Sequence, residues 1–316
     1  MTDVLASSTG SRSAEDFLAA VRQRRERFEG AARQAEVERA LPADIVAMMR
    51  EVGLFWLKTP VGLGGTELDP IAFCDVLEEV AYYDASAGWA AMVGNGCTGI
   101  AAGWLPDDGI AEVFANADEL PVLAGQVTPR GKAVPVAGGY VVTGRWGFCS
   151  GILHAGWLLA GCMVEGEPGR MVIVFVPKSE ATVHDNWHVA GLQGTGSCDV
   201  SVTEVFVPAG RTIDLAAARP LRGGDLYRQP VLLFVANELG PVAVGVARRA
   251  LDDMYELAGA TARGATGTAL SERAAFQKDI AHCECRLRAV RLLYRDAVER
   301  VWVASTSGAP LGDAEI

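Results

Sequence analysis

The stretch Gly138-Gly-Tyr-Val-Val-Thr-Gly-Arg-Trp-Gly-Phe-Cys-Ser-Gly151 combines a glycine turn, a short alternating strand and an aromatic–hydroxyl pair at the strand's end. Glycine accepts positive φ at little steric cost, so the first two residues suit the turn of a hairpin. A second segment, Gly194-Thr-Gly-Ser197, places two hydroxyls beside glycines. Together the two segments predict a wall for a flat ring rich in nitrogen and oxygen, and hence a cofactor site.

This stretch lies within a β-rich region. Short runs rich in β-branched and aromatic residues are separated by Gly, Pro and Asp turns, a pattern typical of an antiparallel barrel or sandwich. The predicted strands cover residues 121–126, 133–136, 140–145, 156–164, 171–177, 182–189 and 199–207. We therefore predict a central antiparallel β-barrel domain over residues 119–222.

Helical periodicity flanks the β-rich region on both sides. The predicted helices cover residues 16–39, 43–52 and 70–83 before it, and residues 239–257 and 271–303 after it. The sequence thus predicts an α+β multidomain fold, with a helical N-terminal domain over 1–118 and a C-terminal helical bundle over 223–316. Two long amphipathic helices alone leave their apolar stripes half covered. Because Asp313 also resembles an N-cap, we expect this bundle to be incomplete, with further helices to follow.

The composition excludes several classes of partner. The formal net charge of −11 and the pI near 4.9 disfavour binding to nucleic acid or to anionic membranes. The most apolar later stretch, residues 231–247, is interrupted by Asn237, Glu238 and Pro241 and is too polar to span a bilayer. Seven scattered cysteines and the lack of a signal peptide favour reduced thiols in the cytoplasm. The four histidines have no metal-ligand spacing, so no metal site is expected.

Several motifs in this order resemble the acyl-CoA dehydrogenase superfamily over nearly the whole chain. The family's leucine-proline, glycine-leucine and glycine-glycine pattern is matched by Leu41-Pro42, Gly53-Leu54 and the run 60–65. Its second-helix signature resembles residues 77–89, and the first helix of its bundle resembles residues 240–250. Residues 146–155, with 194–197, are most similar to the flavin-dependent monooxygenase branch. The resemblance implies a helical domain, a β-barrel and a four-helix bundle that enclose a flavin, either FAD or FMN.

The resemblance also assigns candidate flavin contacts. Phe148 and Ser150 fall where the family places an aromatic face and a hydroxyl against the flavin ring, and Trp146 lies beside them in sequence. The remaining candidates fall where the family contacts the pyrimidine edge, the ring or the phosphate tail: Gln126, Val127, Thr128, Thr195, Ser197, Arg263 and Gln277.

All of these candidates except Gln277 also have an interpretation without a cofactor. Phe148 and Trp146 are then ordinary core aromatics at a strand end, and residues 126–128 an edge strand before a turn. The segment 194–197 is then a glycine-rich turn between strands, and Arg263 a solvated loop residue.

Three functions remain open from the sequence. The first is a monooxygenase that takes reduced flavin from a separate reductase and uses O₂ to oxygenate a small organic substrate. The second is an FAD-dependent acyl-CoA or acyl-carrier dehydrogenase, which needs a carboxylate base. At the place where the resemblance implies this base, residues 232–234 have only apolar side chains. Glu238 lies one helical turn away from that place. The third is a truncated, non-catalytic binding protein. No catalytic residue is assigned, phenol hydroxylation is disfavoured because residues 124–126 lack a histidine, and the resemblance implies a homodimer or homotetramer.

Overall fold

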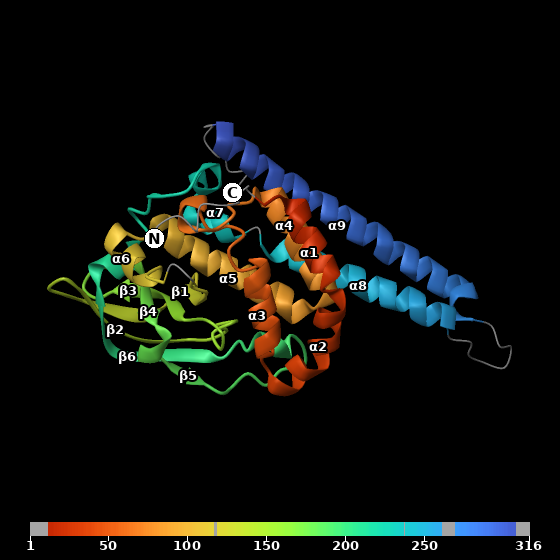
Figure 1. The fold of residues 1–316 in the computed structure, drawn as a ribbon, viewed down its shortest axis with the longest axis horizontal. Helices are drawn as coiled ribbons and strands as arrows, with labels where there is room; N and C mark the ends of the chain where they lie inside the picture. The colour runs from red at the N-terminus through yellow and green to blue at the C-terminus, as the bar shows by residue number, and fades with distance from the viewer. Residues whose placement is uncertain (1–11, 117–118, 237, 261–268, 308–316) are drawn as a thin grey trace, which may run out of the picture.

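The computed structural model describes residues 12–116, 119–236, 238–260 and 269–307. Helices come first along the chain and lie on one side of a sheet (Figure 1). They are α1 (Ala14–Gln23), α2 (Arg25–Glu38), α3 (Ala43–Val52), α4 (Pro70–Tyr83), α5 (Ala85–Trp104) and α6 (Asp107–Val113). The predicted single helix over 16–39 is two helices, because the chain turns at Arg24, whose N–H donates to the Val21 carbonyl at 3.0 Å.

Side-chain caps fix where α4 and α5 begin. Asp69 accepts hydrogen bonds from the N–H groups of Ile71 and Ala72 at the start of α4, and Asp84 accepts one from Ala87 at the start of α5. Helix α5 is apolar and buried over most of its surface because it lies between the other helices and the sheet (Figure 1). Helix α5 therefore packs against the other helices on one side and against the sheet on the other.

The central sheet has seven strands in the order β5-β6-β2-β1-β3-β4-β7. They are β1 (Leu123–Val136), β2 (Gly139–Trp146), β3 (Trp157–Val164), β4 (Met171–Pro177), β5 (Thr182–His184), β6 (Asp199–Pro208) and β7 (Thr212–Asp214). The predicted layout of helices, strands and helices is confirmed, but the sheet is not a closed antiparallel barrel. It is open at β5 and β7, and β1 runs parallel to β3. The long β1 pairs with β2 through one half and with β3 along most of its length.

Trp146 organises the core on one face of the sheet. Its side chain is fully buried, and its Nε1 donates to the Gly161 carbonyl at 2.8 Å. Gly131 and Gly144 make room for the indole, since a Cβ at either position would lie within 2.7 Å of the ring. The opposite face of the sheet packs against α5 through a separate apolar cluster that includes Trp104. Both faces of the sheet are therefore covered around its centre.

The C-terminal helices are α7 (Val231–Ala236), α8 (Leu239–Ala260) and α9 (Ala274–Ser307). Helix α8 packs closely on α4 at Gly245, where a Cβ would lie 2.3 Å from the Glu78 carbonyl oxygen. The far ends of α8 and α9 extend away from the rest of the molecule (Figure 1), and Leu292 and Leu293 on α9 are about 70% exposed. Within the described ranges, none of the helices combines the length and apolarity needed to cross a membrane.

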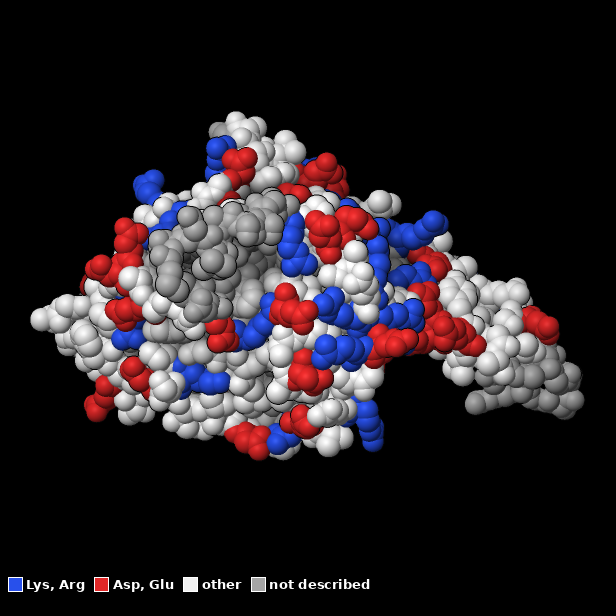
Figure 2. All heavy atoms as spheres, in the orientation of Figure 1, with Lys and Arg blue, Asp and Glu red and all other residues white. Residues whose placement is uncertain are grey.

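Charged side chains of both signs are interspersed on the face shown in Figure 2. Opposite charges also pair between the described helices, for example Arg22 with Glu79 at 3.2 Å and Arg27 with Asp44 at 3.3 Å. Exposed pairs of this kind contribute only about 0–1 kcal/mol each to stability. Among the described residues of this face, the two signs alternate and form no extended basic surface of the kind that binds nucleic acid.

Candidate active site

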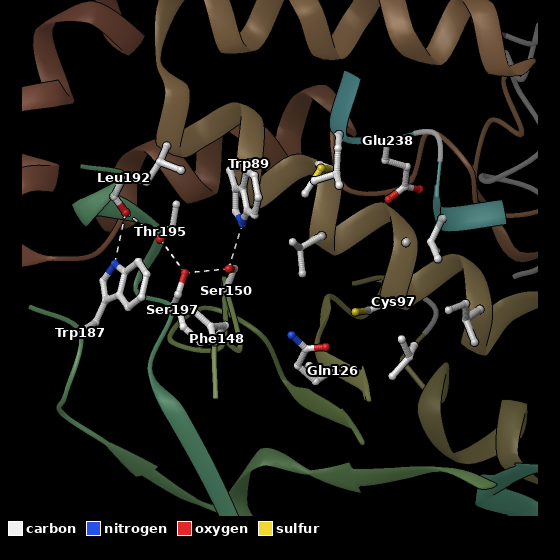
Figure 3. Close-up of a pocket in the computed structure, with 18 residues that line it drawn as sticks. Trp89, Cys97, Gln126, Phe148, Ser150, Trp187, Leu192, Thr195, Ser197 and Glu238 are labelled. Carbon is white, nitrogen blue, oxygen red and sulfur yellow. Dashed lines mark hydrogen bonds between the residues drawn. The ribbon is translucent and has the colours of Figure 1, made fainter. Parts of the chain in front are cut away.

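A cavity of about 310 Å³ lies between α5, the sheet and the start of α8 (Figure 3). Its volume falls at the lower end of the range for small-molecule sites. Most of its walls are apolar, with a few polar groups concentrated in two places. The lining residues are Trp89, Met92, Val93, Gly96, Cys97, Ile100, Gly125, Gln126, Val127, Phe148, Ser150, Trp187, Leu192, Thr195, Ser197, Val235, Glu238 and Leu239.

Aromatic rings form one side of this cavity. The ring of Phe148 packs edge-on against Trp187, with centroids 6.0 Å apart and planes at 83°. Phe148 follows the end of β2, has a φ of 59° and is 68% exposed. A left-handed φ is unfavourable for a bulky residue and is concentrated at binding sites. Phe148 therefore presents an exposed aromatic face of the kind on which planar rings stack.

Three buried hydroxyls lie beside these rings. Ser150 Oγ and Ser197 Oγ are 2.6 Å apart, and Thr195 Oγ1 is 2.7 Å from Ser197 Oγ. Glycines allow the loop to place them, because a Cβ at Gly194 would lie 2.8 Å from Ala35 Cβ. Gly196, between Thr195 and Ser197, has a φ of 53°.

A buried ion pair lies across the cavity from these hydroxyls (Figure 3 labels Glu238). Glu238 Oε1 is 2.6 Å from Lys58 Nζ, and both side chains are at most 6% exposed. Burial raises the pKa of Glu238 to about 7, although the Lys58 ammonium opposes that change. Burial also lowers the pKa of Lys58. Of the described residues that line the cavity, Glu238 is the only one with a carboxyl group.

Six of the residues proposed from the sequence line this one cavity: Gln126, Val127, Phe148, Ser150, Thr195 and Ser197. Three others, among the described residues, do not. Thr128 lines a neighbouring surface groove, Trp146 lies in the core of the sheet, and Gln277 lies on α9 and donates to the Ser271 carbonyl at 3.0 Å. Arg263 lies outside the described residues. That the six contact a flavin stays a prediction.

Sequence reasoning missed the contribution of α5 and of the loop before residue 194. In the sequence Trp89 is only the last residue of a helix signature, yet its Nε1 donates to Ser150 Oγ at 2.9 Å. The small residues along α5 are the sequence signal that this helix borders a cavity. Gly96, for example, leaves room for the Glu238 carboxylate, because a Cβ at residue 96 would lie 2.9 Å from Glu238 Oε2. Trp187 carried no such signal, since it lies in an irregular segment.

His154 does not line this cavity. Its ring packs against Phe55 at 5.4 Å between centroids. Burial lowers the pKa of His154 to about 4, and the nearby Arg50 and Lys178 add to this effect.

His154 should therefore make the protein sensitive to acid. The unfolded chain binds a proton near pH 6.5 and the native state only near pH 4, so stability falls as the pH drops through this window. We expect this residue alone to contribute a loss of roughly 3 kcal/mol. Urea unfolding of wild type and His154→Leu between pH 4 and pH 8 measures the difference. Parallel pH profiles for the two proteins would contradict the prediction.

Comparisons with known proteins identify the family. The model of the "Acyl-CoA dehydrogenase, N-terminal domain" matches residues 11–103, and that of the "Acyl-CoA dehydrogenase, C-terminal domain" matches residues 238–315. An indole-3-acetate monooxygenase of Pseudomonas putida is 31% identical over 87% of this chain and 70% of its own length. The oxygenase subunit HsaA of a flavin-dependent monooxygenase from Mycobacterium tuberculosis is 31% identical over 82% of this chain and 67% of its own.

A solved structure agrees with these relatives. XiaF from Streptomyces, in complex with FADH₂ and glycerol, superposes with a TM-score of 0.87 at 25% identity, over 96% of this chain and 78% of that one. The fold and cavity thus define a flavin-dependent oxidoreductase. The chain belongs to the acyl-CoA dehydrogenase superfamily, in its flavin-dependent monooxygenase branch.

Proposed function

We propose that this protein is the oxygenase component of a two-component system, which receives reduced flavin from a separate reductase and uses O₂ to oxygenate a small aromatic substrate. The observation that carries the proposal is the cavity wall made by Phe148, Trp187 and the buried hydroxyls of Ser150, Thr195 and Ser197. A homodimer or homotetramer would suit the exposed apolar side chains of α9.

The residues present fit a flavin ring. An isoalloxazine is flat, has hydrogen-bonding atoms along its edges, and stacks well on aromatic faces. A neighbouring groove shares Gln126 and Phe148 with the cavity and is also lined by Arg130 and Arg145, cations that suit phosphate oxygens. The bound flavin would supply the redox chemistry with O₂. The chain's own residues would hold the ring, exclude water with apolar walls and position the substrate.

The direct test is an anaerobic titration of the purified protein with reduced FMN and reduced FAD, followed by exposure to O₂ with a panel of indoles and phenols. We expect saturable binding of reduced flavin and incorporation of one atom from ¹⁸O₂ into a substrate. Failure to bind either flavin would refute the proposal.

Phe148 should contribute strongly to flavin affinity. Replacing it with alanine removes an aromatic face that a bound ring would cover, so we expect the Kd for reduced flavin to rise about tenfold or more. Phe206→Ala is a matched control, because Phe206 is a 48% exposed phenylalanine on β6 outside the cavity. Equal Kd values for the two variants in anaerobic equilibrium dialysis would contradict a role for Phe148.

One observation favours a second function, dehydrogenation of an acyl thioester. That reaction needs a carboxylate base near the flavin, and the Glu238 carboxyl lines the cavity. Its ion pair with Lys58 argues for a structural use instead. Anaerobic addition of acyl-CoA thioesters to the flavin-loaded protein separates the two functions, because only a dehydrogenase would bleach the flavin absorbance.

A further inference from the structure

A single line of hydrogen bonds runs along one wall of the cavity (Figure 3). Trp89 Nε1 is 2.9 Å from Ser150 Oγ, which is 2.6 Å from Ser197 Oγ. Ser197 Oγ is in turn 2.7 Å from Thr195 Oγ1, and Thr195 Oγ1 is 2.7 Å from the Leu192 carbonyl oxygen. These distances are all short enough to require a hydrogen between each pair of atoms.

The two ends of this line fix its direction. The Leu192 carbonyl can only accept, so Thr195 must donate its one hydroxyl hydrogen to it. Thr195 then has no hydrogen for Ser197, so Ser197 donates to Thr195. By the same logic Ser150 donates to Ser197, and at the other end the Trp89 indole N–H, which can only donate, points at Ser150.

The consequence is that all three hydroxyl hydrogens are used within the wall. What Ser150, Ser197 and Thr195 keep is acceptor capacity, since a hydroxyl oxygen has two lone pairs and each has used one. The three side chains are at most 4% exposed, so bulk water does not readily compete for their hydrogen bonds or reverse their direction. A ligand edge that meets this wall is therefore stabilised by an N–H donor and penalised by another acceptor.

We propose that this fixed polarity makes the site select the reduced flavin over the oxidised flavin, with Thr195 as a positioning residue that sets the polarity. The N5 atom of the isoalloxazine is a bare acceptor in the oxidised ring and carries a hydrogen in the reduced ring. Ser150 would accept from that N5–H and has no hydrogen for an oxidised N5. The inference rests on the proposed function, that is, on a flavin in this cavity.

Thr195→Val and Thr195→Ser form a matched pair of test variants. Valine keeps the size and branching but removes the hydroxyl, so Ser197 is free to donate to Ser150 and Ser150 can turn its hydrogen toward the ligand. The Leu192 carbonyl keeps the Trp187 indole N–H and the Thr195 backbone N–H as donors, each at 3.2 Å. Serine keeps the hydroxyl and hence the polarity.

The measurement is the ratio of the Kd for oxidised flavin to the Kd for reduced flavin, determined anaerobically for wild type and both variants with the flavin that wild type binds. One reversed hydrogen bond is worth about a tenfold change in affinity. We therefore expect the ratio to fall about tenfold in Thr195→Val, and to stay within about twofold of wild type in Thr195→Ser. The midpoint potential of the bound flavin should fall by about 30 mV in Thr195→Val, because a tenfold loss of preference for the reduced form in a two-electron couple corresponds to that shift.

The other outcomes are distinct. If wild type binds neither redox form, the proposed function fails and this inference fails with it. If wild type binds flavin but Thr195→Val leaves the ratio unchanged, or weakens both forms equally, the polarity does not select the redox state and the inference alone is wrong. A wild-type ratio near one would likewise overturn it, since the N3–H edge, present in both forms, would then face the wall.

Discussion

Replacing Lys58 with methionine is expected to lower the free energy of unfolding by about 3–5 kcal/mol, because it leaves the buried Glu238 without its counter-ion. Both side chains are almost fully buried, and Lys58 Nζ also donates to the Phe234 carbonyl and lies 3.5 Å from the centroid of that residue's ring. The Tyr227 hydroxyl donates to the Lys58 backbone carbonyl at 2.7 Å. The pair thus connects the segment before α4 with α7 and the start of α8.

A double variant separates the cost of an unpaired charge from the cost of lost packing. In Lys58→Met/Glu238→Leu no buried charge remains, and replacement of a whole buried pair by apolar groups is often neutral or stabilising. We therefore expect the double variant to recover most of the stability lost in Lys58→Met, as measured by urea unfolding at pH 7.5. A double variant as unstable as the single one would show that packing, not charge, holds these elements.

Much of the candidate site follows from local sequence patterns, because glycine turns and strand ends are local features. Two short segments predict a common site for Phe148, Ser150, Thr195 and Ser197, and these four residues line one cavity. Trp146 shows where such reasoning stops. It lies two residues before Phe148, which on a continuing strand would share its face, but β2 ends at Trp146 and the left-handed φ of Phe148 redirects the chain.

Contacts between distant segments could not be read in this way. Lys58 and Glu238 are 180 residues apart, and neither position has a motif that names the other. The sheet topology was missed for a similar reason, because alternation along β1 does not reveal that its neighbour β3 runs parallel. The domain boundaries at residues 118 and 222 stay predictions.

The second large effect is expected at Gly125, which lies on β1 just before Gln126 and Val127. Its φ is 153°, and a Cβ there would lie 1.9 Å from the Leu159 carbonyl oxygen of the paired strand β3. Gly125→Ala must therefore separate β1 from β3 or distort both. Backbone strain and overpacking each cost about 1–3 kcal/mol, so we expect a total loss of about 3 kcal/mol or more in unfolding free energy.

The same change should also damage the cavity, because Gly125 and the two residues after it line it. We expect flavin binding by Gly125→Ala to be lost even where the variant is still folded. Gly138→Ala is the matched control: its φ of 83° also favours glycine, but nothing lies within 4 Å of its Cβ position. It should cost only about 1 kcal/mol and leave flavin affinity unchanged. If the two alanine variants unfold at the same urea concentration, the close approach of β1 and β3 at Gly125 does not contribute to stability, and the prediction is wrong.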